Sequence, residues 1–103
     1  MKLFLTTTIL ALAVTGSALA DAAAGKAVYT TKCKTCHAAN GEGNPGIAKV
    51  LGVAPKPLAS KEVQGKSDAA MKKDITEGVG KMKPVKLSDT EVKDVIAYVR
   101  TLK

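Results

Sequence analysis

Residues 33–37 read Cys33-Lys34-Thr35-Cys36-His37, and they contain both cysteines and the only histidine of the chain. The spacing C-x-x-C-H is the pattern for attachment of a c-type haem. Each thiol adds across one vinyl group to form a thioether, and a gap of two residues lets both sulfurs reach the two vinyls from one turn of chain. The adjacent imidazole is then directed at the iron as its proximal ligand. The pattern therefore predicts one haem c, with its iron, held by Cys33, Cys36 and His37.

Three other interpretations of the two cysteines have less support. A disulfide between Cys33 and Cys36 would close a very small loop and stabilise the fold little. A thioredoxin-like redox pair requires a βαβ context, and the sequence shows no strand pattern. A zinc site requires four protein ligands, and the chain has no second pair of Cys or His.

Residues 1–20 have the features of a secretory signal peptide. A positively charged start precedes the mostly apolar residues 3–14, and Ala18-Leu19-Ala20 fits the A-x-A cleavage pattern. The apolar run is short for a membrane span, which argues against the alternative of an uncleaved anchor. We therefore expect cleavage after Ala20, export to the periplasm, and a single mature domain over residues 21–103 without a transmembrane segment.

The composition fits a small basic domain that needs a cofactor. After the leader, Tyr29 and Tyr98 are the only aromatic residues of a 103-residue chain without Trp. A domain of this size buries little surface, so a large apolar cofactor would supply missing core material. The formal net charge is +7, one unit of it from Lys2, and the charge is scattered. Nucleic-acid binding is therefore not expected, whereas attraction to an acidic protein surface or to anionic lipid is.

A methionine is the expected second axial ligand of the iron, because the chain has no second histidine. Met1 leaves with the leader. Met71 lies four residues before Ile75 on one predicted helical face, which favours core packing. Met82 lies in an irregular loop with two glycines and a proline, which can present a side chain to a flat ligand. We predict Met82 as the ligand; the alternative is an apolar residue on a surface loop.

Ligation by one histidine and one methionine would decide the function. Both axial positions of the iron are then filled, and the thioether favours the ferrous state. We therefore expect a one-electron carrier that cycles between Fe(II) and Fe(III) and has no catalytic residues. The enzymatic alternative is a small haem peroxidase or gas sensor, which needs an open sixth position. A second alternative is an electron-accepting subunit bound permanently to a dehydrogenase.

The pattern of apolar and capping residues predicts an all-α domain of three or four helices around the haem. The first spans residues 22–31 with Asp21 as its N-cap. The second begins at Ser67 or Asp68 and ends near Gly78. The last begins with a capping box and carries one apolar stripe, and the residues of the box and the stripe are Ser88, Glu91, Val92, Val95, Ile96, Val99 and Leu102.

Residues 40–66 are interrupted by many glycines and prolines. We expect this stretch to be loop, with a short turn of helix at residues 47–51.

In order and spacing, these elements resemble a small class I cytochrome c of the bacterial periplasmic type, over nearly all of residues 21–103. The resemblance implies that the last helix crosses the first near Gly25, where a missing side chain permits close approach. Gly25 and Tyr29 resemble the family's Gly-x-x-x-aromatic pattern in the first helix, and residues 87–102, with Tyr98-Val99, resemble its last helix. The family most often has proline directly after the axial methionine, whereas Lys83 intervenes here, which would change the angle at which the loop approaches the iron.

The resemblance also assigns a role to residues 41–45, Gly41-Glu42-Gly43-Asn44-Pro45. They resemble a Gly-rich loop whose proline lies beside the proximal histidine. By that similarity, the Pro45 carbonyl would accept a hydrogen bond from His37 Nδ1 and fix the tautomer of the ring.

Five lysines lie close in sequence to the two haem-binding segments and would form a positive rim around an exposed haem edge. We call them the lysine collar: Lys32, Lys34, Lys81, Lys83 and Lys86. The collar predicts docking onto an acidic redox protein or a membrane respiratory complex; the alternative is a solvated charged surface. The carrier itself is expected to be a monomer.

Overall fold

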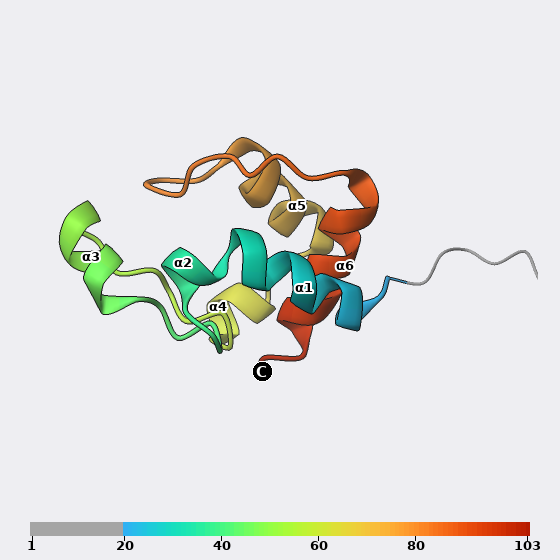
Figure 1. Cartoon of the computed structure of the whole chain (residues 1–103), viewed down its shortest axis with the longest axis horizontal. Helices are drawn as coiled ribbons and strands as arrows, with labels where there is room; N and C mark the ends of the chain where they lie inside the picture. The colour runs from blue at the N-terminus through green and yellow to red at the C-terminus, as the bar shows by residue number, and fades with distance from the viewer. Residues whose placement is uncertain (1–19) are drawn as a thin grey trace, which may run out of the picture.

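The computed structural model describes residues 20–103, so the predicted leader lies outside the described residues except for Ala20. Helices alternate with irregular segments, and no strand occurs in this part of the chain, where one isolated bridge joins Val79 and Met82. Figure 1 shows α3 at the end of the molecule opposite to the point where the chain enters at residue 20. The predicted all-α fold is confirmed, with the helices α1 (Ala22–Lys32), α2 (Lys34–His37), α3 (Pro45–Leu51), α4 (Lys61–Gln64), α5 (Asp68–Glu77) and α6 (Asp89–Arg100).

The three predicted helix starts are confirmed by their caps. The Asp21 carboxylate accepts hydrogen bonds from the amides of Ala23 and Ala24 at the start of α1. The Ser67 side chain accepts from Ala70 at the start of α5. At α6, Ser88 and Glu91 form the reciprocal capping box. Each cap satisfies amides that the helix itself leaves without partners.

The expectation that residues 40–66 form loop with one short turn of helix underestimates the helical content of this segment, which contains two helices. Helix α3 begins at Pro45, where a missing amide hydrogen is not needed, and the Asn44 side chain caps it. Helix α4 was not predicted; it is a single turn capped by Ser60. These short segments bring the total above the three or four helices that the sequence indicated.

The packing of α1 against α6 organises the domain. A Cβ atom built on Gly25 would lie 1.9 Å from the Asp94 carbonyl oxygen, so only glycine permits the two backbones to approach this closely. Nearby, the rings of Tyr29 and Tyr98 lie 5.1 Å apart at 57°, a tilted arrangement that aromatic pairs favour. The expected crossing at Gly25 is therefore present.

The apolar stripe of α6 supplies most of the core. Val92, Val95, Ile96 and Val99 are buried, and Leu102, beyond the end of the helix, is half-buried. The core cluster includes Met71, which is 6% exposed, and the half-buried residues Leu58, Val63, Ile75 and Leu87 pack against it. The prediction that Met71 serves in the core is confirmed.

Side chains and backbone from three segments meet at the end of α6. The Arg100 guanidinium donates to the carbonyl oxygens of Gln64 and Lys66 and pairs with Asp68 at 2.8 Å. The side-chain amide of Gln64 donates through Nε2 to the carbonyl oxygens of Leu58 and Val99. These bonds hold the segment around α4 against the C-terminal end of α6.

Candidate functional site

The C-x-x-C-H residues lie on one turn of chain at the end of α1. Cys33 is the C-cap residue of α1, where its amide donates to the Tyr29 carbonyl oxygen, and it also serves as the N-cap residue of α2. The His37 amide donates to the Cys33 carbonyl oxygen at 3.0 Å, which closes the turn. The structure therefore brings Cys33, Cys36 and His37 together as the sequence spacing requires.

Both thiols are free, and their surroundings differ. Cys36 is exposed, whereas Cys33 is half-buried. Desolvation, with a smaller contribution from Cys36, raises the pKa of the Cys33 thiol to about 11. The Cys33 thiol is therefore protonated at neutral pH, and its sulfur lies at the edge of the protein interior.

His37 is half-buried, and this burial lowers the pKa of its imidazole. A lowered pKa keeps the ring neutral at neutral pH, which is the form that binds a metal. The Nδ1 atom is buried and has no hydrogen-bond partner among the described residues. A buried nitrogen without a partner is unfavourable, so Nδ1 lacks the hydrogen bond that usually orients a metal-binding imidazole.

The hydrogen bond expected between His37 Nδ1 and the Pro45 carbonyl is not formed in the structure. Pro45 is the first residue of α3, so its carbonyl is directed along the helix axis. The loop before Pro45 does lie against α2: the Gly43 amide donates to the His37 carbonyl at 2.9 Å, and the Asn44 amide donates to the Cys36 carbonyl at 2.9 Å. This loop thus fixes the backbone on which His37 is carried.

Tyr29 has a role that the sequence did not reveal. Its hydroxyl donates to the Ala38 carbonyl oxygen at 2.5 Å. Ala38 follows His37 and has φ 66° and ψ 175°, a conformation that is almost confined to glycine. The phenol therefore holds a strained peptide directly after His37. Nothing in the sequence indicated this conformation, because position 38 is alanine and not the glycine that usually adopts a positive φ at the end of a helix.

Met82 lies on a different segment, the loop between α5 and α6. The amides and carbonyls of Val79 and Met82 pair with each other at 3.0 and 2.9 Å, which makes a tight turn. Gly78 has φ 80°, and a Cβ atom there would lie 2.6 Å from the Met82 carbonyl oxygen. The Met82 side chain is half-buried. The predicted irregular loop is confirmed.

No hydrogen bond joins the Met82 turn to the C-x-x-C-H turn in the described part of the chain. The α5–α6 loop nevertheless extends toward the end of the molecule where α2 and α3 lie (Figure 1). The α5–α6 loop is bonded to the end of α5: the Val85 amide donates to the Ile75 carbonyl oxygen at 2.8 Å.

The lysine collar is exposed at all five positions. Within residues 20–103, the ion pairs involve other cations, and no member of the collar pairs with a carboxylate. Their charge is thus available to an approaching molecule.

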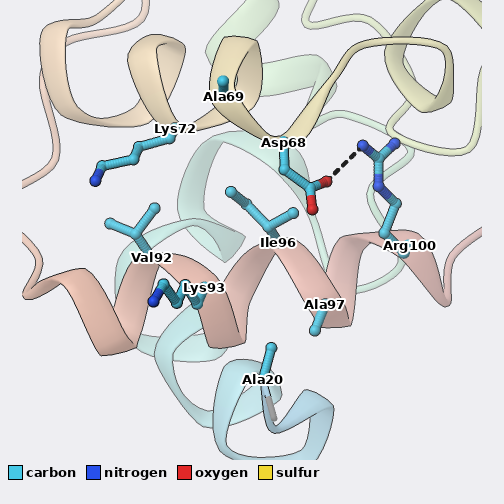
Figure 2. A pocket seen from close by; sticks show the side chains of 9 residues that line it. All are labelled: Ala20, Asp68, Ala69, Lys72, Val92, Lys93, Ile96, Ala97 and Arg100. Atoms are coloured by element: carbon cyan, nitrogen blue, oxygen red, sulfur yellow. Dashed lines mark hydrogen bonds and ion pairs between the residues drawn. The ribbon is translucent and has the colours of Figure 1, made fainter. Parts of the chain in front are cut away.

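One pocket of about 510 Å³ lies between α5 and α6, away from the C-x-x-C-H turn. Figure 2 shows Asp68 and Arg100 paired at its upper rim, and Ala20 on the opposite side of α6. A smaller pocket of about 280 Å³ is lined by Pro45 and the neighbouring loop residues. No group of three or more His, Cys, Asp or Glu that could hold a metal ion occurs in residues 20–103. No helix in the same range is both long and apolar enough to cross a membrane.

The residues of the C-x-x-C-H turn fit a covalently bound haem. Two free thiols one helical turn apart can form two thioethers, and the neutral imidazole can bind the iron.

Comparison with known proteins agrees with this fit. The family described as Cytochrome c matches residues 22–103. Cytochrome c-555 of Chlorobaculum tepidum is 36% identical over 98 residues, which cover 86% of this chain and 84% of that protein. Cytochrome c6 of Synechocystis sp. is 36% identical over 83 residues, covering 78% of this chain and 64% of that protein. The solved structure of the KustC0563 c-type cytochrome superposes with a TM-score of 0.66 at 34% identity, covering 77% of this chain and 96% of that chain.

Proposed function

The chain belongs to the cytochrome c family and is an electron carrier with covalently bound haem c, and from this premise we propose that it is a periplasmic one-electron shuttle whose axial ligands are His37 and Met82. When bound, the haem supplies the Fe(II)/Fe(III) couple. The observation that carries the proposal is the placement of two free thiols and a neutral imidazole on one turn of chain. It is a carrier and not an enzyme.

The protein's part in this function is to attach and orient. Cys33 and Cys36 supply the two sulfur atoms for the thioethers. His37 supplies a neutral imidazole, and the bonds from Tyr29 and Gly43 to the neighbouring backbone hold the orientation of this residue. A rigid ligand set suits electron transfer, because little of the surroundings has to move when the charge of the iron changes.

Met82 is proposed as the second axial ligand on two grounds. Met71, the other methionine of the mature chain, is committed to the core at 6% exposure. Met82 is half-buried in a tight turn whose shape depends on Gly78, so its side chain is carried on a defined backbone. Pro45 remains a proposed contact of the cofactor beside His37, without the hydrogen bond to Nδ1.

The axial ligand is tested in the protein matured with haem c, by comparing Met82→Ala with Met71→Leu as the matched control. We expect the ferric absorption spectrum to change and the ferrous protein to bind carbon monoxide rapidly only in Met82→Ala, because that variant opens the sixth position. An unchanged ferric spectrum in Met82→Ala would reject the ligand assignment. Rapid carbon monoxide binding by the unmodified protein would favour the peroxidase or gas-sensor alternative.

Export to the periplasm is proposed from the signal-peptide pattern of residues 1–20. It requires that the periplasmic product begins at Asp21, and the mass of the intact haem protein measures this directly. A product that retains the leader would reject the proposed processing but would leave the assignment as an electron carrier unaffected.

The partner of the carrier is proposed to present an acidic docking surface. The five exposed lysines of the collar carry no intramolecular ion pair in the described residues, so their charge is available for docking. An acidic redox protein or the acidic face of a membrane respiratory complex has the complementary charge.

A further inference from the structure

Asp94 is the one charged side chain that lies buried in residues 20–103, at 9% exposure. It stands in α6 at the crossing with α1, where its own carbonyl oxygen approaches Gly25. Its carboxylate oxygen Oδ1 accepts a hydrogen bond from the backbone nitrogen of Asp21 at 2.8 Å. This bond joins the two ends of the mature domain across the α1–α6 interface.

The carboxylate of Asp94 has no cationic side chain as a partner. None of the ion pairs formed within the described residues includes it. A buried carboxylate is unfavourable unless an opposite charge or several hydrogen bonds compensate for the lost hydration. A neutral peptide N–H at 2.8 Å gives only part of that compensation.

The nitrogen beside Asp94 is also the atom that the signal-peptide pattern singles out. The A-x-A pattern places the cut between Ala20 and Asp21. Hydrolysis of that bond by water, at an export peptidase, leaves Ala20 as the carboxylate of the released leader. The Asp21 nitrogen takes up protons and becomes an α-ammonium at neutral pH. The cleavage pattern and the contact with the buried carboxylate thus point independently to the Asp21 nitrogen.

We propose that Asp94 is the binding site for the amino terminus created by leader removal, and that the ion pair between the Asp21 α-ammonium and the Asp94 carboxylate completes the α1–α6 interface. The inference rests on the proposed cleavage after Ala20 and is independent of the haem ligands. Before cleavage the same place holds only a neutral amide, so processing strengthens the packing of the mature fold.

Other charges near this terminus affect the pair. The Asp21 carboxylate caps α1 through the amides of Ala23 and Ala24, and its negative charge also favours an ammonium. The partial positive charge at the start of α1 instead disfavours an ammonium at this position. Lys93, on α6, lines the same pocket as Ala20 (Figure 2) and opposes it as well. Asp94 is the buried member of this set, so its contribution is screened least by solvent.

The pairing is tested in the mature haem protein by measuring the pKa of the Asp21 α-amine by NMR. We expect a pKa above the ordinary range of about 7.7 to 8.0, and a fall of about one unit in Asp94→Asn, which keeps the shape and an acceptor oxygen but removes the charge. Asp89→Asn is the matched control, because that side chain lies on the same helix and is 86% exposed. It should leave the pKa of the α-amine unchanged.

Acetylation of the α-amine provides a second measurement that does not depend on the variant. It should reduce the folding equilibrium constant about tenfold in the unmodified protein and little in Asp94→Asn, as expected for a partly buried ion pair. A product cleaved at another residue would overturn both the proposed processing and the pairing. Cleavage after Ala20 with the same α-amine pKa in Asp94→Asn would overturn the pairing alone.

Discussion

The hydroxyl of Tyr29 donates a hydrogen bond to the carbonyl oxygen of Ala38 at 2.5 Å. Tyr29 is 1% exposed, and burial is the largest cause that raises the pKa of its phenol to about 12. The phenol therefore stays protonated and can donate at any pH at which the protein works. Because Ala38 follows His37 directly, this bond couples α1 to the proposed iron ligand.

Replacement of Tyr29 by phenylalanine should destabilise the protein by about 1 to 2 kcal/mol, since it leaves the Ala38 carbonyl without its donor. The free energy of unfolding in denaturant measures this loss. Tyr98→Phe is the control, because that hydroxyl donates no hydrogen bond in the part of the chain described and the ring pair is kept. Equal losses in the two variants would mean that the bond to Ala38 contributes nothing beyond the loss of a phenol hydroxyl.

Replacement of Ala38 by glycine should stabilise the protein by roughly 1 kcal/mol. At φ 66° and ψ 175° alanine is strained, and the relief exceeds the entropy that glycine adds to the unfolded chain. The denaturation midpoint provides the measurement. Ala39→Gly, one residue further on and without a positive φ, should instead lose a few tenths of a kcal/mol. A loss of stability in Ala38→Gly would contradict the presence of strain.

Replacement of Gly25 by alanine should destabilise the fold by about 3 kcal/mol or more, because the added Cβ would meet the backbone of α6 at 1.9 Å. The yield of haem-loaded protein and its denaturation midpoint should both fall. Gly46→Ala is the matched control, since its Cβ would meet only the Asn44 Oδ1 atom, at 3.3 Å, and it should change stability by less than about 1 kcal/mol. Normal stability of Gly25→Ala would show that the helices can separate without loss.

The capping box of α6 should make stability depend on pH in the acid range. The hydrogen bond from the Ser88 amide is the largest cause that holds the pKa of Glu91 below its usual value. A lowered folded pKa means that the contribution of Glu91 is complete above its unfolded pKa of about 4.3 and is lost as the pH falls through the folded value. Glu91→Gln should therefore be less stable than the unmodified protein at pH 7, and the difference should vanish once the pH has fallen below the folded pKa of Glu91. A difference that persists in acid would reject a charge-based contribution.

Electron transfer to an acidic partner should slow as salt is added, because ions screen the attraction of the lysine collar over about 10 Å at 0.1 M. Stopped-flow rates against ionic strength measure this slope. Replacing Lys81 and Lys83 by glutamine should flatten it, whereas replacing Lys56 and Lys61, which lie outside the collar, should not. A rate that is constant or rises with added salt would reject steering by opposite charge.

The chemistry of this protein could be predicted from five consecutive residues, because thioether formation and imidazole ligation require groups that are neighbours in the chain. The helix starts at Asp21, Ser67 and Ser88 were equally predictable, since a cap involves an amide only two or three residues away. The stripe of α6 followed from its helical period. Helix α4 was missed because closely spaced glycines and prolines obscure a single turn capped by Ser60.

What the amino-acid order determined by itself is therefore local: the haem-binding pattern, the caps and the face of each long helix. Contacts between residues far apart in the chain were decided only by the tertiary structure. Asp21 meets Asp94 across 73 positions, and Tyr29 reaches the peptide after His37. Such contacts depend on how closely α1 and α6 approach at Gly25, and that distance results from the packing of both helices together, which no single stretch of sequence encodes.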